Sequence, residues 1–197
     1  NNFFQILITD KEQHFSLQTK LDNMTENIQF KGSSENTAFY TYLNFLSARN
    51  KEAEPLNKAA EETTEPAAKE ALQAQLNEIG ARVKAYQIEF VKKHAPMLAS
   101  RIVAANLNPE IPEFEGTEEE KSIKMIYYLR AHYFDNLDLS DPALLRSPFL
   151  FEKIDYYVSK LHYQHPDSIA TAIDTIIARL RPAEESFKFY LVHFLNA

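Results

Sequence analysis

The sequence contains no cysteine and no tryptophan. Without cysteine, these residues form no disulfide, no thiolate metal site and no cysteine nucleophile. A protein kept in a reducing compartment usually retains a thiol or two by chance, so the absence favours a history of export. Enzyme mechanisms that depend on a cysteine are therefore excluded for this polypeptide.

Glycine is scarce as well. The 197 residues include only three glycines, whereas average usage is about 7%. All-β folds need glycine at many tight turns, and helices need few. Hydrophobic residues make up 45% of the chain and charged residues 25%, which is ordinary for a globular protein. We therefore expect a mainly α fold.

Long apolar runs and clustered basic residues are also missing. Because no run of about 18 apolar residues and no signal-peptide pattern occurs, we expect no bilayer span and no direct membrane contact by these residues. The net charge is −7 and no stripe of lysine and arginine is present, which argues against a nucleic-acid partner. The chain starts without methionine and ends within an apolar-periodic segment, so we expect it to be a fragment of a longer protein.

Residues 1–33 differ in pattern from the rest of the chain. The runs FFQILIT, HFSLQT and NIQF are short and rich in aromatic or β-branched residues, and in the second run Phe15 and Leu17 share one face. They predict two or three short β-strands, which are not stable alone. The strands either pack on the following helices or are the remnant of a preceding β domain, and we favour the remnant. An α-helical domain is then predicted over residues 34–197.

The helical period begins at Ser34, with Ser33 or Ser34 as the N-cap, and predicts a helix to about Thr63. Pro66 starts a second helix, because proline fits the first helical turn but not a helix interior. This second helix needs a partner along a heptad seam. The preceding helix would give an antiparallel hairpin, and a neighbouring chain is the alternative. The seam consists of Leu72, Leu76, Ile79, Val83, Tyr86 and Phe90.

Five more helices are predicted after this hairpin. Thr117 and Glu120 have the spacing of a capping box, and Pro148 and Pro166 stand where helices should begin. No repeat of fixed period is present. The predicted architecture is an array of antiparallel helical hairpins, similar to tetratricopeptide folds but without a clear repeat. The approximate ranges are 97–107, 118–136, 148–164, 167–180 and 183–197.

Three aspartates, Asp135, Asp138 and Asp141, recur at intervals of three in the segment HYFDNLDLSDPALLRSPFLFEK. A calcium loop needs oxygen ligands at alternate positions and a central glycine, and this segment has leucines at two such positions and no glycine. An acid–base site that also uses His132 is possible by spacing. We favour helix capping and ion pairing, in which Arg130 and Arg146 are the expected partners.

Two histidines, His162 and His165, are three residues apart. This spacing lets two side chains on a helix share a metal, but two histidines do not make a site, and the H-E-x-x-H arrangement is absent. We therefore predict no metal site and no cofactor.

Aromatic residues recur in successive helices, often as doublets, and doublets make a helix apolar on more than one side. Such residues usually belong to the core between stacked helices. The alternative is an aromatic groove that binds a peptide, a glycan or an unfolded chain. The candidate partner-binding residues are Tyr127, Tyr128, Tyr156 and Tyr157.

Four segments in order carry a family resemblance: GSSENTAFYTYLNFL, AYQIEFVKKHAPMLASRIVAA, HYFDNLDLSDPALLRSPFLFEKIDYYVSKL and HPDSIATAIDTIIARL. They resemble the helical middle region of bacterial cell-envelope thioredoxin-like thiol-disulfide oxidoreductases. In that family, the helical region follows an N-terminal lipoprotein-type β domain and precedes a C-terminal thioredoxin-like domain with a Cys-x-x-Cys motif. The resemblance implies a periplasmic location in a lipid-anchored parent.

The absence of cysteine means that the family's redox motif has no counterpart here. We therefore expect a non-enzymatic region that acts as a spacer, presents client polypeptides to the parent's thioredoxin-like domain, or associates with a second copy of itself. The alternative is an independent helical module that recognises a peptide or glycan through an aromatic groove.

Overall fold

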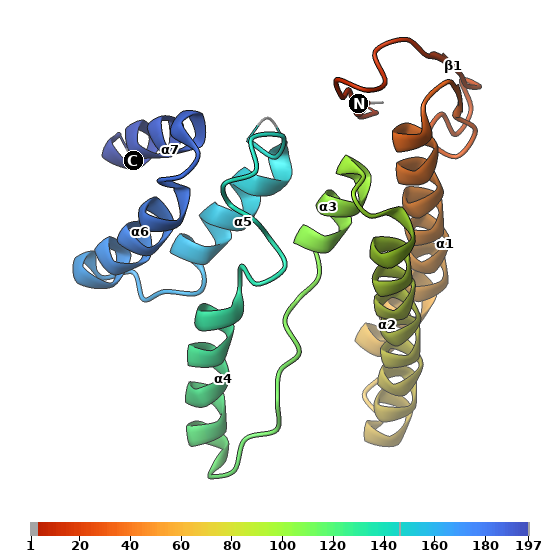
Figure 1. Ribbon diagram of the computed structural model, residues 1–197. Helices are drawn as coiled ribbons and strands as arrows, with labels where there is room; N and C mark the ends of the chain where they lie inside the picture. The colour runs from red at the N-terminus through yellow and green to blue at the C-terminus, as the bar shows by residue number, and fades with distance from the viewer. Residues whose placement is uncertain (1–3, 146, 197) are drawn as a thin grey trace. The chain divides into compact units, whose positions relative to one another are not determined.

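The computed structural model describes residues 4–145 and 147–196 (Figure 1). Arg146, one of the two expected partners of the aspartates, lies outside these residues. The chain divides into two compact units, Asn1–Ala104 and Ala105–Ala197, here called the N-terminal and C-terminal units. The described residues form seven helices and one two-stranded antiparallel sheet. The prediction of a mainly α fold with short N-terminal strands is confirmed.

The N-terminal strands pack on the first helix. Strands β1 (Ser16–Gln18) and β2 (Gln29–Lys31) pair antiparallel, with Leu17 opposite Phe30. The Phe30 ring lies 5.3 Å from that of Tyr40 on helix α1 (Ser34–Glu62). In this structure the strands belong to the same compact unit as α1. That they are the remnant of a preceding β domain, with a domain boundary at residue 33, stays a prediction.

Two buried polar contacts hold the N-terminal segment against α1. The side chain of Asn36 accepts a hydrogen bond from the amide of Leu7 at 2.8 Å and donates one to its carbonyl at 2.7 Å. The hydroxyl of Tyr40 donates to the carbonyl of Gln5 at 2.8 Å. Since Asn36 is fully buried, its amide group needs these partners.

The start of α1 is capped twice. Ser33 is the N-cap, as predicted, and its hydroxyl accepts from the amide of Asn36. The carboxylate of Glu12 accepts hydrogen bonds from the Ser33 hydroxyl at 2.7 Å, from the Ser34 hydroxyl, and from the amides of Ser34 and Glu35 at 2.9 and 3.1 Å. A negative group at this end also interacts favourably with the helix dipole.

Helices α1 and α2 (Pro66–His94) form the predicted antiparallel hairpin (Figure 1). The six residues of the predicted seam are all buried or half-buried. At the base of the hairpin, the ring of Tyr86 stacks on that of Phe45 at 3.8 Å, and Phe90 lies 5.4 Å from Tyr42. The seam therefore has its partner within the chain.

Helix α3 (Leu98–Ala105) is tied to α1 rather than only to its neighbour in sequence. The buried carboxylate of Glu35 accepts hydrogen bonds from the amides of Leu98 and Ala99, both at 2.9 Å. These amides are the first donors of α3 and have no partner within the helix. Glu35 therefore fixes where α3 begins.

The C-terminal unit contains α4 (Glu118–His132), α5 (Pro148–Ser159), α6 (Pro166–Leu180) and α7 (Glu184–Leu195). The capping box of Thr117 and Glu120 is confirmed, as are the first-turn positions of Pro148 and Pro166. Helices α5, α6 and α7 pack in succession around a buried core of Leu150, Ile154, Ala172, Ile176, Leu180 and Tyr190.

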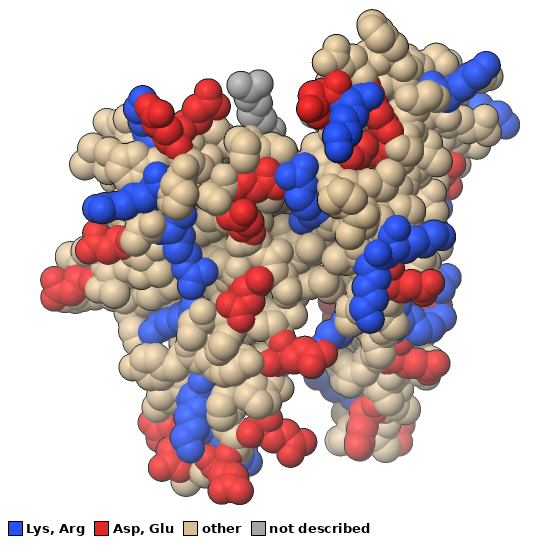
Figure 2. Space-filling model, viewed as in Figure 1, with Lys and Arg blue, Asp and Glu red and all other residues tan. Residues whose placement is uncertain are grey.

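Helix α4 ends at His132, four residues before the predicted Asn136. Tight turns replace its last turn, since the amide of Asp135 donates to the carbonyl of His132 and that of Leu137 to Phe134. None of the described helices combines the length and apolarity that a bilayer crossing requires. On the face seen in Figure 2, acidic and basic side chains are intermixed over both units.

Candidate functional site

The three aspartates lie in turns between α4 and α5 and have separate partners. Asp135 pairs with His132, with 2.7 Å between the carboxylate oxygen and Nδ1. Asp138 accepts hydrogen bonds from the amide and hydroxyl of Ser140 at 2.9 and 2.6 Å. The Asp141 carboxylate accepts from the amide of Ala143 at 3.0 Å.

The contact of Asp141 is local, as predicted, but it closes a turn and does not cap a described helix. Asp138, expected as an ion-pair partner, also closes a turn, with Ser140. The ion-pair prediction was wrong for Arg130, whose Nε donates to the carbonyl of Leu161 instead. Helix α4 ends at His132, and Asp135 pairs with that histidine. The residues that the structure describes contain no group of three or more histidine, aspartate or glutamate side chains that could hold a metal.

The two candidate metal-binding histidines have different environments. His165 is the N-cap residue of α6, makes no side-chain capping bond and is largely exposed. His162 is half-buried, its Nε2 is buried without a hydrogen-bond partner, and its ring lies 4.8 Å from that of Tyr157. Burial, followed by the nearby charge of Arg130, lowers the pKa of His162.

The four candidate tyrosines differ in exposure. Tyr127 is 64% exposed and Tyr156 49%. Tyr128 is half-buried and stacks on His132 at 4.1 Å, whereas Tyr157 is only 4% exposed. Tyr156 and Tyr157 both stack on Tyr133. Tyr157 thus belongs to the core, and Tyr127 and Tyr156 offer accessible ring faces to a partner.

Three cations lie against aromatic rings in the C-terminal unit. The guanidinium of Arg130 lies 5.6 Å from the ring centres of both Tyr127 and Tyr163. The ammonium of Lys153 lies 4.7 Å from the ring centre of Tyr133. We call this group the cation–aromatic cluster, and its members are Arg130, Lys153, Arg179, Tyr127, Tyr133, Phe134, Tyr157, His162 and Tyr163.

The third cation, Arg179 on α6, lies over Phe134, with its guanidinium carbon 5.6 Å from the ring centre. Phe134 in turn contacts Tyr157 at 4.8 Å between ring centres. Turns and helices far apart in sequence therefore meet here. The contacts are of the cation–π type, which contribute about 0.5–1 kcal/mol each at exposed sites.

Burial dominates the electrostatics of the cluster. It lowers the pKa of Lys153, and no carboxylate among the described residues counteracts this shift. Burial, with a smaller contribution from Tyr156, raises the pKa of Tyr133 to about 12. Burial also raises the pKa of Tyr157, while the charges of Arg179 and Arg130 act in the opposite direction. The surroundings of the Tyr157 hydroxyl are therefore electropositive.

Sequence reasoning selected the tyrosines but missed the cations. Arg130 follows Tyr127 by three residues on α4, a spacing that places both on one helix face, and this signal was readable. The approach of Arg179 to Phe134 depends on how α6 packs and has no local signal. The cluster can bind ligands through charge and ring faces.

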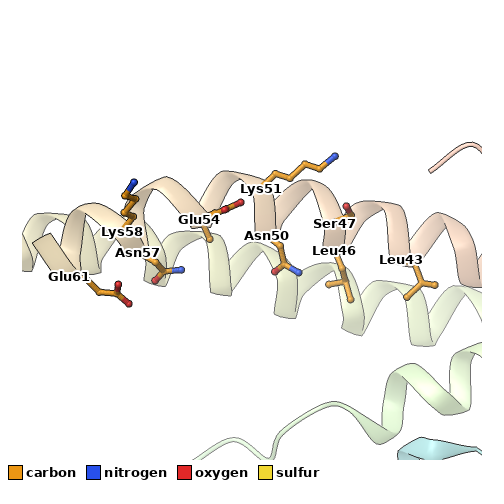
Figure 3. A pocket seen from close by; sticks show the side chains of 10 residues that line it. Leu43, Leu46, Ser47, Asn50, Lys51, Glu54, Asn57, Lys58 and Glu61 are labelled. Atoms are coloured by element: carbon orange, nitrogen blue, oxygen red, sulfur yellow. The ribbon is translucent and has the colours of Figure 1, made fainter. Parts of the chain in front are cut away.

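A second feature is a hollow of about 820 Å³ along α1 (Figure 3). Leu43, Leu46, Asn50 and Asn57 project from one side of the helix, and Lys51 projects from the other. Its apolar side chains are Leu43, Leu46 and Ala53, and its other lining residues are polar or charged. A hollow of about 580 Å³ next to α7 is lined by Phe189, Val192, His193, Lys188 and Asn196.

In a comparison with known families, residues 47–196 match a domain of unknown function, DUF5106. The chain belongs to the DUF5106 family. No curated protein and no solved structure matches it. The DUF5106 match contains the whole cation–aromatic cluster and begins inside α1, so it leaves out the strands and the Glu12 cap.

Proposed function

We propose that this chain is a non-catalytic helical module that binds polypeptides, either clients or a second copy of itself. The observation that carries the proposal is the surface around Arg130, where Tyr127 and Tyr163 are 64% and 74% exposed and flank the guanidinium. Tyrosine and arginine are enriched among the residues that dominate binding energy at protein interfaces.

The proposal extends to the parent protein. The sequence resembles the helical region of envelope thioredoxin-like thiol-disulfide oxidoreductases, and the absence of cysteine leaves any dithiol chemistry to another domain of such a parent. In that setting the module presents clients, or spaces the redox domain, on the periplasmic side of the envelope. Reading the gene beyond the codon for Ala197 tests this directly: a Cys-x-x-Cys domain is expected, and a stop codon there contradicts it.

Binding is tested with the full chain and a fluorescently labelled, cysteine-alkylated unfolded protein, by fluorescence anisotropy. The double variant Tyr127→Ala/Tyr163→Ala is expected to weaken binding about tenfold or more, since truncating a dominant interface residue costs about 2 kcal/mol. Phe189→Ala on α7, which removes a ring that is 50% exposed, is the matched control and should bind as the wild type does. Equal weakening by both, or no binding by the wild type, contradicts the proposal.

An independent glycan-binding module is the second candidate, because exposed tyrosine faces such as those of Tyr127 and Tyr163 also stack on sugars. The same anisotropy assay separates the two. Displacement of the labelled polypeptide by soluble oligosaccharides, and not by unlabelled unfolded protein, favours the glycan.

A further inference from the structure

The cations of the cation–aromatic cluster have no acidic partners. No carboxylate of the described residues forms an ion pair with Arg130, Lys153 or Arg179. Lys121 and Lys188, by contrast, pair with glutamates of their own helices. The cluster thus gathers three cations without an ion pair among the described residues, and its charge complements a ligand of opposite sign.

The two arginines are connected by a chain of contacts. Arg130 donates to the carbonyl of Leu161, the residue before His162, and Arg179 lies over the ring of Phe134. Successive rings from His162 through Tyr157 to Phe134 are 4.8 Å apart between centres. Tyr157 and Phe134 are buried, so a ligand meets the arginines at the edge of these rings.

Both guanidinium groups can still bind a carboxylate. A guanidinium that lies over a ring keeps its N–H edges in its own plane and free to donate. Arg130 uses Nε toward Leu161, which leaves its terminal amino groups, and Arg179 is exposed. Arginine binds carboxylates through paired, charge-assisted hydrogen bonds, and such bonds are stronger beside low-dielectric rings than in open water.

We propose that Arg130 and Arg179 bind carboxylates of an acidic polypeptide segment. This inference rests on the proposed function and specifies the chemistry of the partner. Two guanidinium groups on different helices provide for more than one carboxylate of the same segment. The exposed rings of Tyr127 and Tyr163 beside Arg130 add apolar area for the same segment.

The test compares two acetylated, amidated peptides that differ only in having four glutamates or four glutamines, by isothermal titration with the full chain. The glutamate peptide should bind about tenfold more tightly or better. Arg179→Gln and Arg130→Gln should each reduce its affinity about tenfold. Arg179→Lys should retain only part of the affinity for the glutamate peptide, because lysine lacks the planar guanidinium that donates two parallel hydrogen bonds to a carboxylate. Arg181→Gln, which removes an exposed cation near Arg179, is the matched control and should leave affinity unchanged.

Several results would overturn the inference. One is equal affinity for both peptides, and another is an equal loss in Arg181→Gln, which would indicate only long-range attraction. Displacement of the peptide by equimolar inorganic phosphate would indicate a small-anion site. Self-association that Arg179→Gln abolishes would make a second copy the occupant.

The failure of this inference can be told apart from the failure of the proposed function. If the neutral unfolded protein still binds while the glutamate peptide does not, this inference fails and the proposed function stands. If neither binds, both fail.

Discussion

The carboxylate of Glu12 should make the start of α1 sensitive to acid, and Glu12→Gln tests this. Burial alone would raise the pKa of Glu12, but hydrogen bonds from the side chains of Ser34 and Ser33 and from the amides of Glu35 and Ser34 outweigh it and lower the pKa from 4.5 to about 2. A difference of that size corresponds to about 3 kcal/mol at about 1.4 kcal/mol per pKa unit. Because the side chain is half-exposed, solvent screening reduces the expected contribution to about 1–2 kcal/mol.

The direction of the pH dependence follows from the lowered pKa of Glu12. The stabilisation is complete above pH 4.5, where the carboxylate is charged in both the folded and the unfolded chain, and it is lost as the pH falls toward 2. Glu12→Gln should therefore lower the free energy of unfolding by about 1–2 kcal/mol at pH 7. Near pH 2 the variant and the wild type should have nearly equal stability.

Urea unfolding at several pH values measures the difference, and amide hydrogen exchange at Ser34 and Glu35 reports the local opening of the cap. Glu70→Gln, at an exposed position of α2, is the control and should show no such dependence. A stability difference between Glu12→Gln and the wild type that stays constant from pH 7 to pH 2 would refute the reasoning, as would unchanged exchange at both amides.

Two further predictions concern the cores of the two units. Phe90→Ala removes a ring that is 3% exposed and should cost about 3–5 kcal/mol in urea unfolding, whereas Ile88→Ala on the exposed side of the same helix should cost much less; similar losses would contradict the hairpin packing. Burial lowers the pKa of Lys153, and the hydrogen bond that Lys188 donates to Glu184 raises the pKa of Lys188, so Lys153 should titrate below Lys188. The ¹³Cε shifts of both lysines measure the order, and the reverse order would contradict the burial of Lys153.

The sequence was sufficient for the elements whose signals are local. The heptad spacing from Leu72 to Phe90 predicted both the second helix and its hairpin partner, because one apolar stripe must be covered. Ser33 and the capping box at Thr117 were readable for the same reason: a cap and its helix are adjacent in the chain.

Contacts between distant residues could not be read in this way. Glu12 caps a helix that starts 22 positions later, and Asn36 bonds to Leu7 across 29 positions, so no spacing rule indicates either contact. The tyrosine doublet at 156 and 157 indicated a helix that is apolar on two sides. Which of the two rings is buried is decided only by packing against Phe134.

The two ring pairs at the base of the α1–α2 hairpin bear on how this family should be divided for experiments. The family match begins at residue 47, in the middle of α1, whereas Tyr42 and Phe45 supply half of the rings that meet Tyr86 and Phe90. A fragment cut at the family boundary would expose the apolar face of α2 and would be expected to aggregate. A recombinant fragment that starts before Glu12 retains both the rings and the cap, and is the sounder unit for crystallisation.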